Sequence, residues 1–272
     1  MPTLHLVATP IGNLEDITLR ALRVLQEVSL IAAEDTRTTR KLLSHYGIKA
    51  RLTSYHEHNK GAKIPYILAA LQGGDVALVS ESGTPGLSDP GYDLVAAAAE
   101  AGVPVAAVPG PSAVVAALAV SGLPTRQFTY VGFLPRRSRE RRRLLSALAA
   151  RPQTIVALES PHRLPATLSD LLAVLGDRRI AVCRELTKLH EEVFRGLTSE
   201  ALAHFREPRG EFTLVLAGAS EPAEAIVPTE AVLAELRQLR LLGMVPREAV
   251  TQVAQQFGLP RRQVYRLWLQ LP

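Results

Sequence analysis

The chain has 272 residues, of which 47% are hydrophobic and 21% are charged, and its formal net charge is +5. This composition excludes a disordered or fibrous protein, and the length predicts two domains rather than one small core. No apolar run approaches the roughly 20 residues of a membrane span, and the first residues lack the basic start of a signal peptide, so we expect a cytoplasmic protein. The single cysteine, Cys183, excludes an intrachain disulfide and a site built from several cysteines.

The first part of the chain repeats one unit, in which a short apolar run is followed by a loop and then by a helical pattern. Such runs cover residues 4–8, 29–33, 76–80 and 105–108. The alternation predicts an α/β fold with a parallel sheet, whose loops gather at the carboxyl ends of the strands, where α/β proteins bind ligands. No GxGxxG and no Gly-Lys-Ser/Thr follows any run, which argues against the usual dinucleotide and P-loop sites.

The longest of these loops, residues 81–91, contains three glycines and two prolines. Glycines allow a positive φ and a close approach of the backbone to a ligand, while prolines stiffen the loop. An ordinary connection between a strand and a helix takes about two to six residues. Eleven residues of this composition therefore favour a ligand-binding loop over a plain connection.

The pattern changes after Gly122, where a Gly-Leu-Pro segment precedes a strand pattern at 128–134 and then a basic helix. We predict an N-terminal α/β domain at 1–121, a C-terminal α/β domain at 122–222 and a helical tail at 228–272.

Six of the eight residues at 136–143 are arginine, and only Glu140 among them is acidic. Cations so close together repel one another unless an anion screens them, and the guanidinium group suits phosphate. A solvated helix face is the alternative, but the pattern favours nucleic acid. The candidate RNA contacts are Arg136, Arg137, Arg139, Arg141, Arg142 and Arg143.

The tail carries apolar residues at helical spacing over 247–257 and 261–271, on either side of a Gly-Leu-Pro turn. Two short helices around a glycine turn resemble a helix-turn-helix unit. Its second helix would present Arg261 and Arg262 to a nucleic acid, although a hairpin that only packs fits the pattern equally well.

Acid–base chemistry has several candidates. His56 and His58 have metal-ligand spacing, but no third ligand is evident, so we expect no metal and assign them to polar surface or substrate contact. Carboxylates also fall at or near the ends of predicted strands, where a base or a ribose acceptor would lie. The sequence does not rank them, and the candidates to test first are Asp35, Glu57 and Glu185.

Seven motifs, in order, strongly resemble the tetrapyrrole methylase family, and in particular its ribosomal-RNA branch. The motifs are Thr9-Pro-Ile-Gly-Asn, Ala33-Glu-Asp-Thr-Arg, Ser82-Gly-Thr-Pro-Gly-Leu-Ser-Asp-Pro-Gly, Pro109-Gly-Pro-Ser-Ala, Glu159-Ser-Pro-His-Arg, Arg184-Glu-Leu-Thr-Lys and Gly210-Glu-Phe-Thr-Leu-Val. The resemblance covers essentially the whole chain. In the wider family the first loop is glycine-rich with a Gly-Pro pair; the departure here, Thr9-Pro-Ile-Gly, favours the RNA branch over a tetrapyrrole substrate.

The resemblance implies a class III S-adenosylmethionine-dependent methyltransferase that acts on the ribose 2′-oxygen of a decoding-centre cytidine in 16S rRNA. It further implies a homodimer, two α/β domains of the tetrapyrrole methylase type, the cofactor S-adenosyl-L-methionine in the cleft between them, and a substrate held in the small ribosomal subunit. The implied cofactor contacts are Pro10, Gly12, Gly83, Thr84, Leu87, Ser88, Ser112, Ala113, Leu158, Leu186 and Thr213. The alternatives are a corrin or porphyrin methylase of the same fold and a non-catalytic RNA-binding assembly factor.

Overall fold

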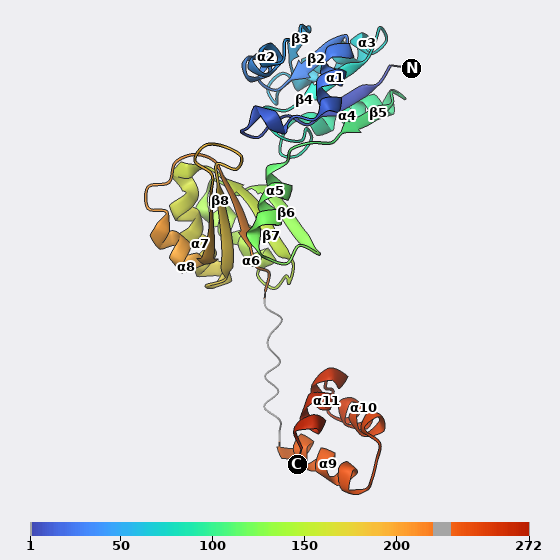
Figure 1. Cartoon of the computed structure of the whole chain (residues 1–272), viewed down its shortest axis with the longest axis vertical. Helices are drawn as coiled ribbons and strands as arrows, with labels where there is room; N and C mark the ends of the chain where they lie inside the picture. Colours follow the sequence, from blue (N-terminus) through green and yellow to red (C-terminus); the bar gives the residue numbers. More distant parts are fainter. Residues whose placement is uncertain (1, 220–229, 272) are drawn as a thin grey trace. The chain divides into compact units, whose positions relative to one another are not determined.

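The computed structural model describes residues 2–219 and 230–271, which belong to two compact units, Met1–Ala219 and Ser220–Pro272 (Figure 1). The predicted limits at 222, 228 and 272 lie outside the described residues. The larger unit contains two five-stranded sheets, and the smaller unit is helical.

The first sheet is parallel throughout, as the repeated strand–loop–helix pattern predicts. Its strand order is β3-β2-β4-β1-β5, in which β3 is a strand that the sequence did not predict. Its strands are β1 (Leu4–Val7), β2 (Leu30–Ala33), β3 (Leu52–Ser54), β4 (Val76–Val79) and β5 (Val105–Val108). Alternate residues of β2 and β4 face opposite helix layers, so both strands are buried along their whole length. Helices α1 (Leu19–Glu27) and α2 (Thr36–His45) cover one face, and α3 (Lys60–Ala70) and α4 (Gly91–Glu100) cover the other.

The second sheet is mixed, with the order β6-β7-β10-β8-β9. Only β6 and β7 run parallel; the other neighbours are antiparallel. The strands are β6 (Phe128–Phe133), β7 (Thr154–Glu159), β8 (Arg179–Arg184), β9 (Glu192–Leu197) and β10 (Phe212–Leu216). A leucine-rich core joins one face to α6 (Ser138–Leu148), α7 (Leu164–Leu175) and α8 (Thr198–His204).

Helix α5 (Ala113–Ser121) lies within the predicted first domain, yet it packs on the second sheet, against β7, β8, β9 and β10 (Figure 1). Its sequence is apolar on all sides, which is typical of a buried helix. Val114, Ala117 and Leu118 pack with Val156 and Val215 of the sheet. The connection after β5 therefore runs directly from the loops of the first sheet to α5, which covers the face of the second sheet opposite α6, α7 and α8.

The smaller unit contains α9 (Glu230–Leu241), α10 (Pro246–Gln256) and α11 (Arg261–Gln270). The two helices that the apolar spacing predicts at its end are confirmed as α10 and α11. Their core closes around Trp268, and the Arg240 guanidinium lies 5.7 Å from the centroid of that indole. Within the described parts of the chain, no helix combines the length and the apolar character of a transmembrane segment.

Candidate functional site

The loops that follow β1, β4 and β5 are tied together by hydrogen bonds. Thr9 and Gly83 exchange two backbone bonds, with N···O distances of 2.9 and 3.0 Å. The Thr84 hydroxyl donates to the Pro111 carbonyl at 3.2 Å. The predicted gathering of these loops at the carboxyl edge of the first sheet is thereby confirmed.

Gly83 stands where these loops are closest. Its φ is +79°, and a Cβ placed there would lie 3.3 Å from Ile11 Cγ2. A larger residue would meet both backbone strain and a packed neighbour. The glycine is therefore required by the local geometry, whatever ligand the loops bind.

The loop after β1 also contacts the loop that follows β8 of the second sheet. The Asn13 N–H donates to the Thr187 hydroxyl at 3.1 Å, and a Cβ on Gly12 would lie 2.9 Å from the Leu186 carbonyl oxygen. A second bridge joins the loop after β4 to β6, where the hydroxyl oxygens of Ser88 and Tyr130 lie 2.7 Å apart. Loops of the first sheet thus contact the second half of this unit at two places, one on the loop after β8 and one on strand β6.

The remaining implied cofactor contacts lie on the second sheet and at the start of α5, apart from Pro10 on the loop after β1 and Leu87 on the loop after β4. Leu158 of β7 and Thr213 of β10 are paired neighbours. By the alternation of strand residues they share a face with Val156 and Val215, on which α5 packs. Ser112 is the N-cap of α5 and Ala113 is its first residue. Leu87 is half exposed on the loop after β4.

Each of the three carboxylates selected from the sequence already has partners. Asp35 is the N-cap of α2, and hydrogen bonds from the side chain and N–H of Arg37 lower its pKa to about 2. Glu57 forms an ion pair with Lys60 at 2.8 Å. Although burial opposes the shift, hydrogen bonds from the Glu211 N–H and Lys188 lower the pKa of Glu185. A lowered pKa makes a carboxylate a weaker base, and a catalytic role for these three stays a prediction.

Glu34 directly follows β2, and its pKa is shifted upward, opposite to the shifts of Asp35 and Glu185. Burial raises its pKa above the ordinary value of 4.5, against the hydrogen bond that its Oε2 accepts from the Glu81 N–H at 3.1 Å. Asp89 and Glu81 raise the pKa further. A raised pKa is a mark of functional carboxylates. The sequence offers only one signal for Glu34, its place at the end of a strand.

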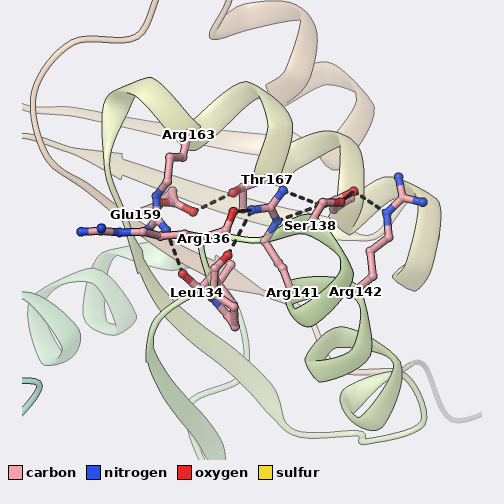
Figure 2. A network of polar contacts seen from close by, with 10 residues as sticks. Leu134, Arg136, Ser138, Arg141, Arg142, Glu159, Arg163 and Thr167 are labelled. Carbon is pink, nitrogen blue, oxygen red and sulfur yellow. Dashed lines mark hydrogen bonds and ion pairs between the residues drawn. The ribbon is translucent and has the colours of Figure 1, made fainter.

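The arginine run on α6 is partly neutralised from within the protein. Arg141 is 3% exposed, and its Nη2 lies 2.5 Å from the Asp170 carboxylate on α7. Arg142 Nε donates to the other Asp170 oxygen at 2.6 Å, and Ser138 donates to both (Figure 2). For Arg141 and Arg142 the screening anion is therefore Asp170 of the protein itself, while the RNA contacts expected at residues 136–143 stay predictions. Arg136, Arg137, Arg139 and Arg143 remain exposed.

The Glu159-Ser-Pro-His-Arg motif has a structural role in the same region. Glu159 is 2% exposed, forms an ion pair with Arg163, and accepts a hydrogen bond from the Thr167 hydroxyl at 2.6 Å (Figure 2). Arg163 also donates to the Leu134 carbonyl at 3.0 Å. These bonds fix the end of β7 to the start of α7.

In the helical unit, Arg261 and Arg262 are exposed on the first turn of α11. They line a groove of about 550 Å³ together with Arg247 and Tyr265. Cations beside an exposed aromatic ring are the means by which proteins bind single-stranded nucleic acid. In the described part of the chain, no three His, Cys, Asp or Glu side chains are arranged to hold a metal.

The two sheets, with their linked strand-end loops, are those of a known class. Residues 3–202 match the family model for Tetrapyrrole (Corrin/Porphyrin) Methylases, and the chain belongs to this family. Among solved structures, it resembles uroporphyrin-III-C-methyltransferase from Thermus thermophilus, with a TM-score of 0.57 and 23% identity over 79% of this chain and 94% of that one. A structure of that enzyme complexed with S-adenosyl homocysteine gives a TM-score of 0.56 at 21% identity, over 80% of this chain and 97% of that one. At these identities the likeness is one of fold.

Full-length relatives are more similar in sequence. The chain is 50% identical to the ribosomal RNA small subunit methyltransferase I of Synechocystis sp., over 100% of this chain and 99% of that protein. It is 45% identical to the protein of that name from Escherichia coli O157:H7, over 98% and 94% of the two chains. The Thermotoga maritima protein of the same name is 52% identical over 80% of this chain and 99% of its own length.

Proposed function

We propose that the protein is an S-adenosylmethionine-dependent methyltransferase that modifies the ribose 2′-oxygen of a decoding-centre cytidine in 16S rRNA. The observation that carries the proposal is the set of linked loops after β1, β4 and β5, which contact Leu186 and Thr187 in the loop after β8 of the second sheet. Relatives that match nearly the whole chain at 45–50% identity are named ribosomal RNA small subunit methyltransferase I, which supports RNA as the substrate. We further propose that the enzyme acts as a homodimer, which sedimentation would test.

The cofactor contacts in this proposal are those implied by the family resemblance. A sulfonium cofactor needs backbone amides and carbonyls for its adenosine and methionine ends more than it needs a phosphate nest. The loops around Thr84 and Ser112, both only partly buried, offer backbone of this kind, while Leu158 and Thr213 offer a partly apolar wall. The bound cofactor supplies an electrophilic methyl group.

The chain's own contribution to the rate is positioning together with proton removal. Holding the 2′-hydroxyl in line with the methyl group removes much of the entropic barrier, and a base that accepts the hydroxyl proton adds about 10²–10⁴-fold. We propose Glu34 as a further candidate for that base, beside Asp35, Glu57 and Glu185, because burial raises its pKa, whereas hydrogen bonds lower those of Asp35 and Glu185.

The pH dependence of a single turnover separates these candidates. With Glu34 as the base, the rate rises with pH through a pKa above 4.5, and Glu34→Gln removes that rise. With Asp35 as the base, the rate is already independent of pH at that point, since the pKa of Asp35 is about 2. Asp35→Asn keeps the helix cap and is the matched control. A Glu34→Gln variant with the wild-type profile would exclude Glu34.

The cofactor loops are tested with two glycine variants. Gly83→Val should abolish S-adenosylmethionine binding in calorimetry, because it adds strain and a contact with Ile11 at the linked loops. Gly47→Val is the matched control, since Gly47 also has a positive φ but has open space where its Cβ would lie. Equal affinities in the two variants would contradict the proposed cofactor site.

The substrate is tested by offering assembled small subunits, deproteinised 16S rRNA and a porphyrinogen to the same enzyme. We expect transfer of the labelled methyl group to RNA, and mapping should place it on the ribose of one cytidine. Transfer to the porphyrinogen alone would favour the corrin or porphyrin alternative. RNA binding without any cofactor affinity would favour the assembly-factor alternative.

A further inference from the structure

A basic groove runs along the outer face of α2, away from the residues assigned to the cofactor. It has a volume of about 610 Å³ and is lined by Leu14, Arg37, Arg40, Lys41, Ser44 and His45. Buried Thr39, Leu42 and Leu43 hold the opposite face of the helix against the first sheet. The cationic side chains therefore project outward from a fixed element.

The positive charges of this groove are only partly neutralised by carboxylates of the protein. Helix α2 contains three cations and a histidine but no carboxylate. Arg37 is paired with Asp35, at an Nη2–Oδ2 distance of 2.9 Å. Arg40 and Lys41, by contrast, have no hydrogen bond or ion pair with any residue that the structure describes. Adjacent free cations in a groove favour an anionic ligand.

A smaller hollow of about 230 Å³ adjoins the groove and shares Leu14 and Lys41 with it. Its inner wall includes Thr9, Ser80 and Glu81, at the carboxyl ends of β1 and β4. Thr9 is 4% exposed, and its hydroxyl has no hydrogen-bond partner in the described structure. Buried hydroxyls are normally satisfied, so this one indicates a ligand that supplies the missing partner.

We propose that the groove and the hollow together hold a single strand of the substrate RNA. Phosphates lie on Arg40 and Lys41, and the sugar and base of one nucleotide enter the hollow. The hollow is smaller than the pockets of about 300–1,000 Å³ that enclose whole drug-sized ligands, so it suits part of a nucleotide better than a complete cofactor. The Glu81 carboxylate repels phosphate but accepts hydrogen bonds from a ribose hydroxyl or a cytosine amine, so the hollow favours the sugar and base of a nucleotide over its phosphate.

This assignment rests on the proposed function and names the surface by which that function reaches its substrate. Thr9 is bonded through its backbone to Gly83, so the hollow is built on the same linked loops as the proposed cofactor site. A nucleotide in the hollow would therefore contact residues that also shape that site.

The test compares two double variants of equal charge change in the full-length protein. Arg40→Gln with Lys41→Gln removes the free cations of the groove. Lys49→Gln with Arg51→Gln is the control, because these exposed residues precede β3, at the amino ends of the strands and opposite the linked loops. Binding is measured with poly-cytidylate over a range of salt concentrations, and methyl transfer is measured on small ribosomal subunits.

We expect the groove variant to bind poly-cytidylate more weakly and to flatten its log–log salt dependence by about 0.7 for each phosphate that it no longer neutralises. The control variant should keep the wild-type slope, and both should bind S-adenosylmethionine normally. Thr9→Val keeps the backbone bonds to Gly83 and removes only the hydroxyl. It should leave the poly-cytidylate affinity unchanged and slow the single turnover on subunits.

The outcomes separate the groove from the proposed function. If the two double variants show equal salt slopes and the wild-type protein still methylates RNA, the groove does not bind RNA, but the proposed function stands. A wild-type protein that methylates no RNA would overturn the function; the groove would still stand if poly-cytidylate binding depended on Arg40 and Lys41.

Discussion

Helices α2 and α6 are both basic, but the two differ in what their cations do. Helix α6 carries the densest charge in the sequence, and two of its arginines are held by one carboxylate of α7. Helix α2 carries fewer cations, and two of them face a groove without a partner in the described structure. The more basic sequence therefore does not leave proportionately more cations free for a ligand.

The difference shows that a run of charge in a sequence does not measure the charge available to a ligand. Asp170 lies 28 residues beyond Arg142 along the chain, and only the packing of α7 on α6 brings it within 2.6 Å. Burial then decides the role of each arginine, because a buried ion pair holds the fold together, whereas an exposed cation can exchange its counter-ions for phosphate.

The largest effect should come from breaking the buried pair on α6. Arg141→Ala leaves the Asp170 carboxylate, whose side chain is 4% exposed, without its closest partner. Removing one partner of a buried pair costs about 3–5 kcal/mol of folding free energy. Arg142→Ala removes a half-exposed partner of the same carboxylate and should cost less than about 1 kcal/mol. Denaturant unfolding measures both, and equal costs would contradict the division between a structural and an exposed arginine.

A smaller effect, on RNA affinity and not on stability, should come from the exposed arginines in α6 and immediately before it. Glutamine at Arg136, Arg137, Arg139 and Arg143 should weaken binding to poly-cytidylate and lower the salt slope by about 0.7 for each phosphate that is no longer neutralised. Arg141 is left in place, since its replacement should destabilise the fold. Comparison with the α2 double variant shows which helix neutralises more phosphates per cation. An unchanged slope for α6 together with a reduced slope for α2 would place the RNA on α2 alone.

Much of the fold could be predicted because its signals are local. The four apolar runs with their following loops determine four strands of the parallel sheet, and the apolar spacing at the end of the chain determines α10 and α11. The fifth strand, β3, was not predicted, because Leu52–Ser54 contains a single apolar residue. Strand β9 was not predicted, since an edge strand with an exposed arginine and a glutamate at its start lacks a buried apolar run. The position of α5 was not predicted either, because an all-apolar helix indicates burial but does not identify the sheet that buries it.

Part of the candidate site could likewise be predicted from the sequence, and part could not. The gathering of the loops follows from the topology of a parallel sheet, so it could be predicted from strand ends alone. The free hydroxyl of Thr9, the raised pKa of Glu34 and the groove on α2 depend on distances between segments far apart in the sequence, and no single stretch of the chain encodes them.

The packing of α5 has a consequence for dividing the protein into fragments. A cut at Gly122, where the sequence suggests a linker, would remove α5 from the second sheet and expose Val156, Ala181, Cys183 and Val215 to water. Such a fragment should aggregate, because an uncovered apolar sheet face associates with other copies. A fragment that begins at Pro109 would keep α5 packed on the second sheet and should not aggregate. The folding unit of the second sheet therefore starts within the loop that follows β5 of the first sheet.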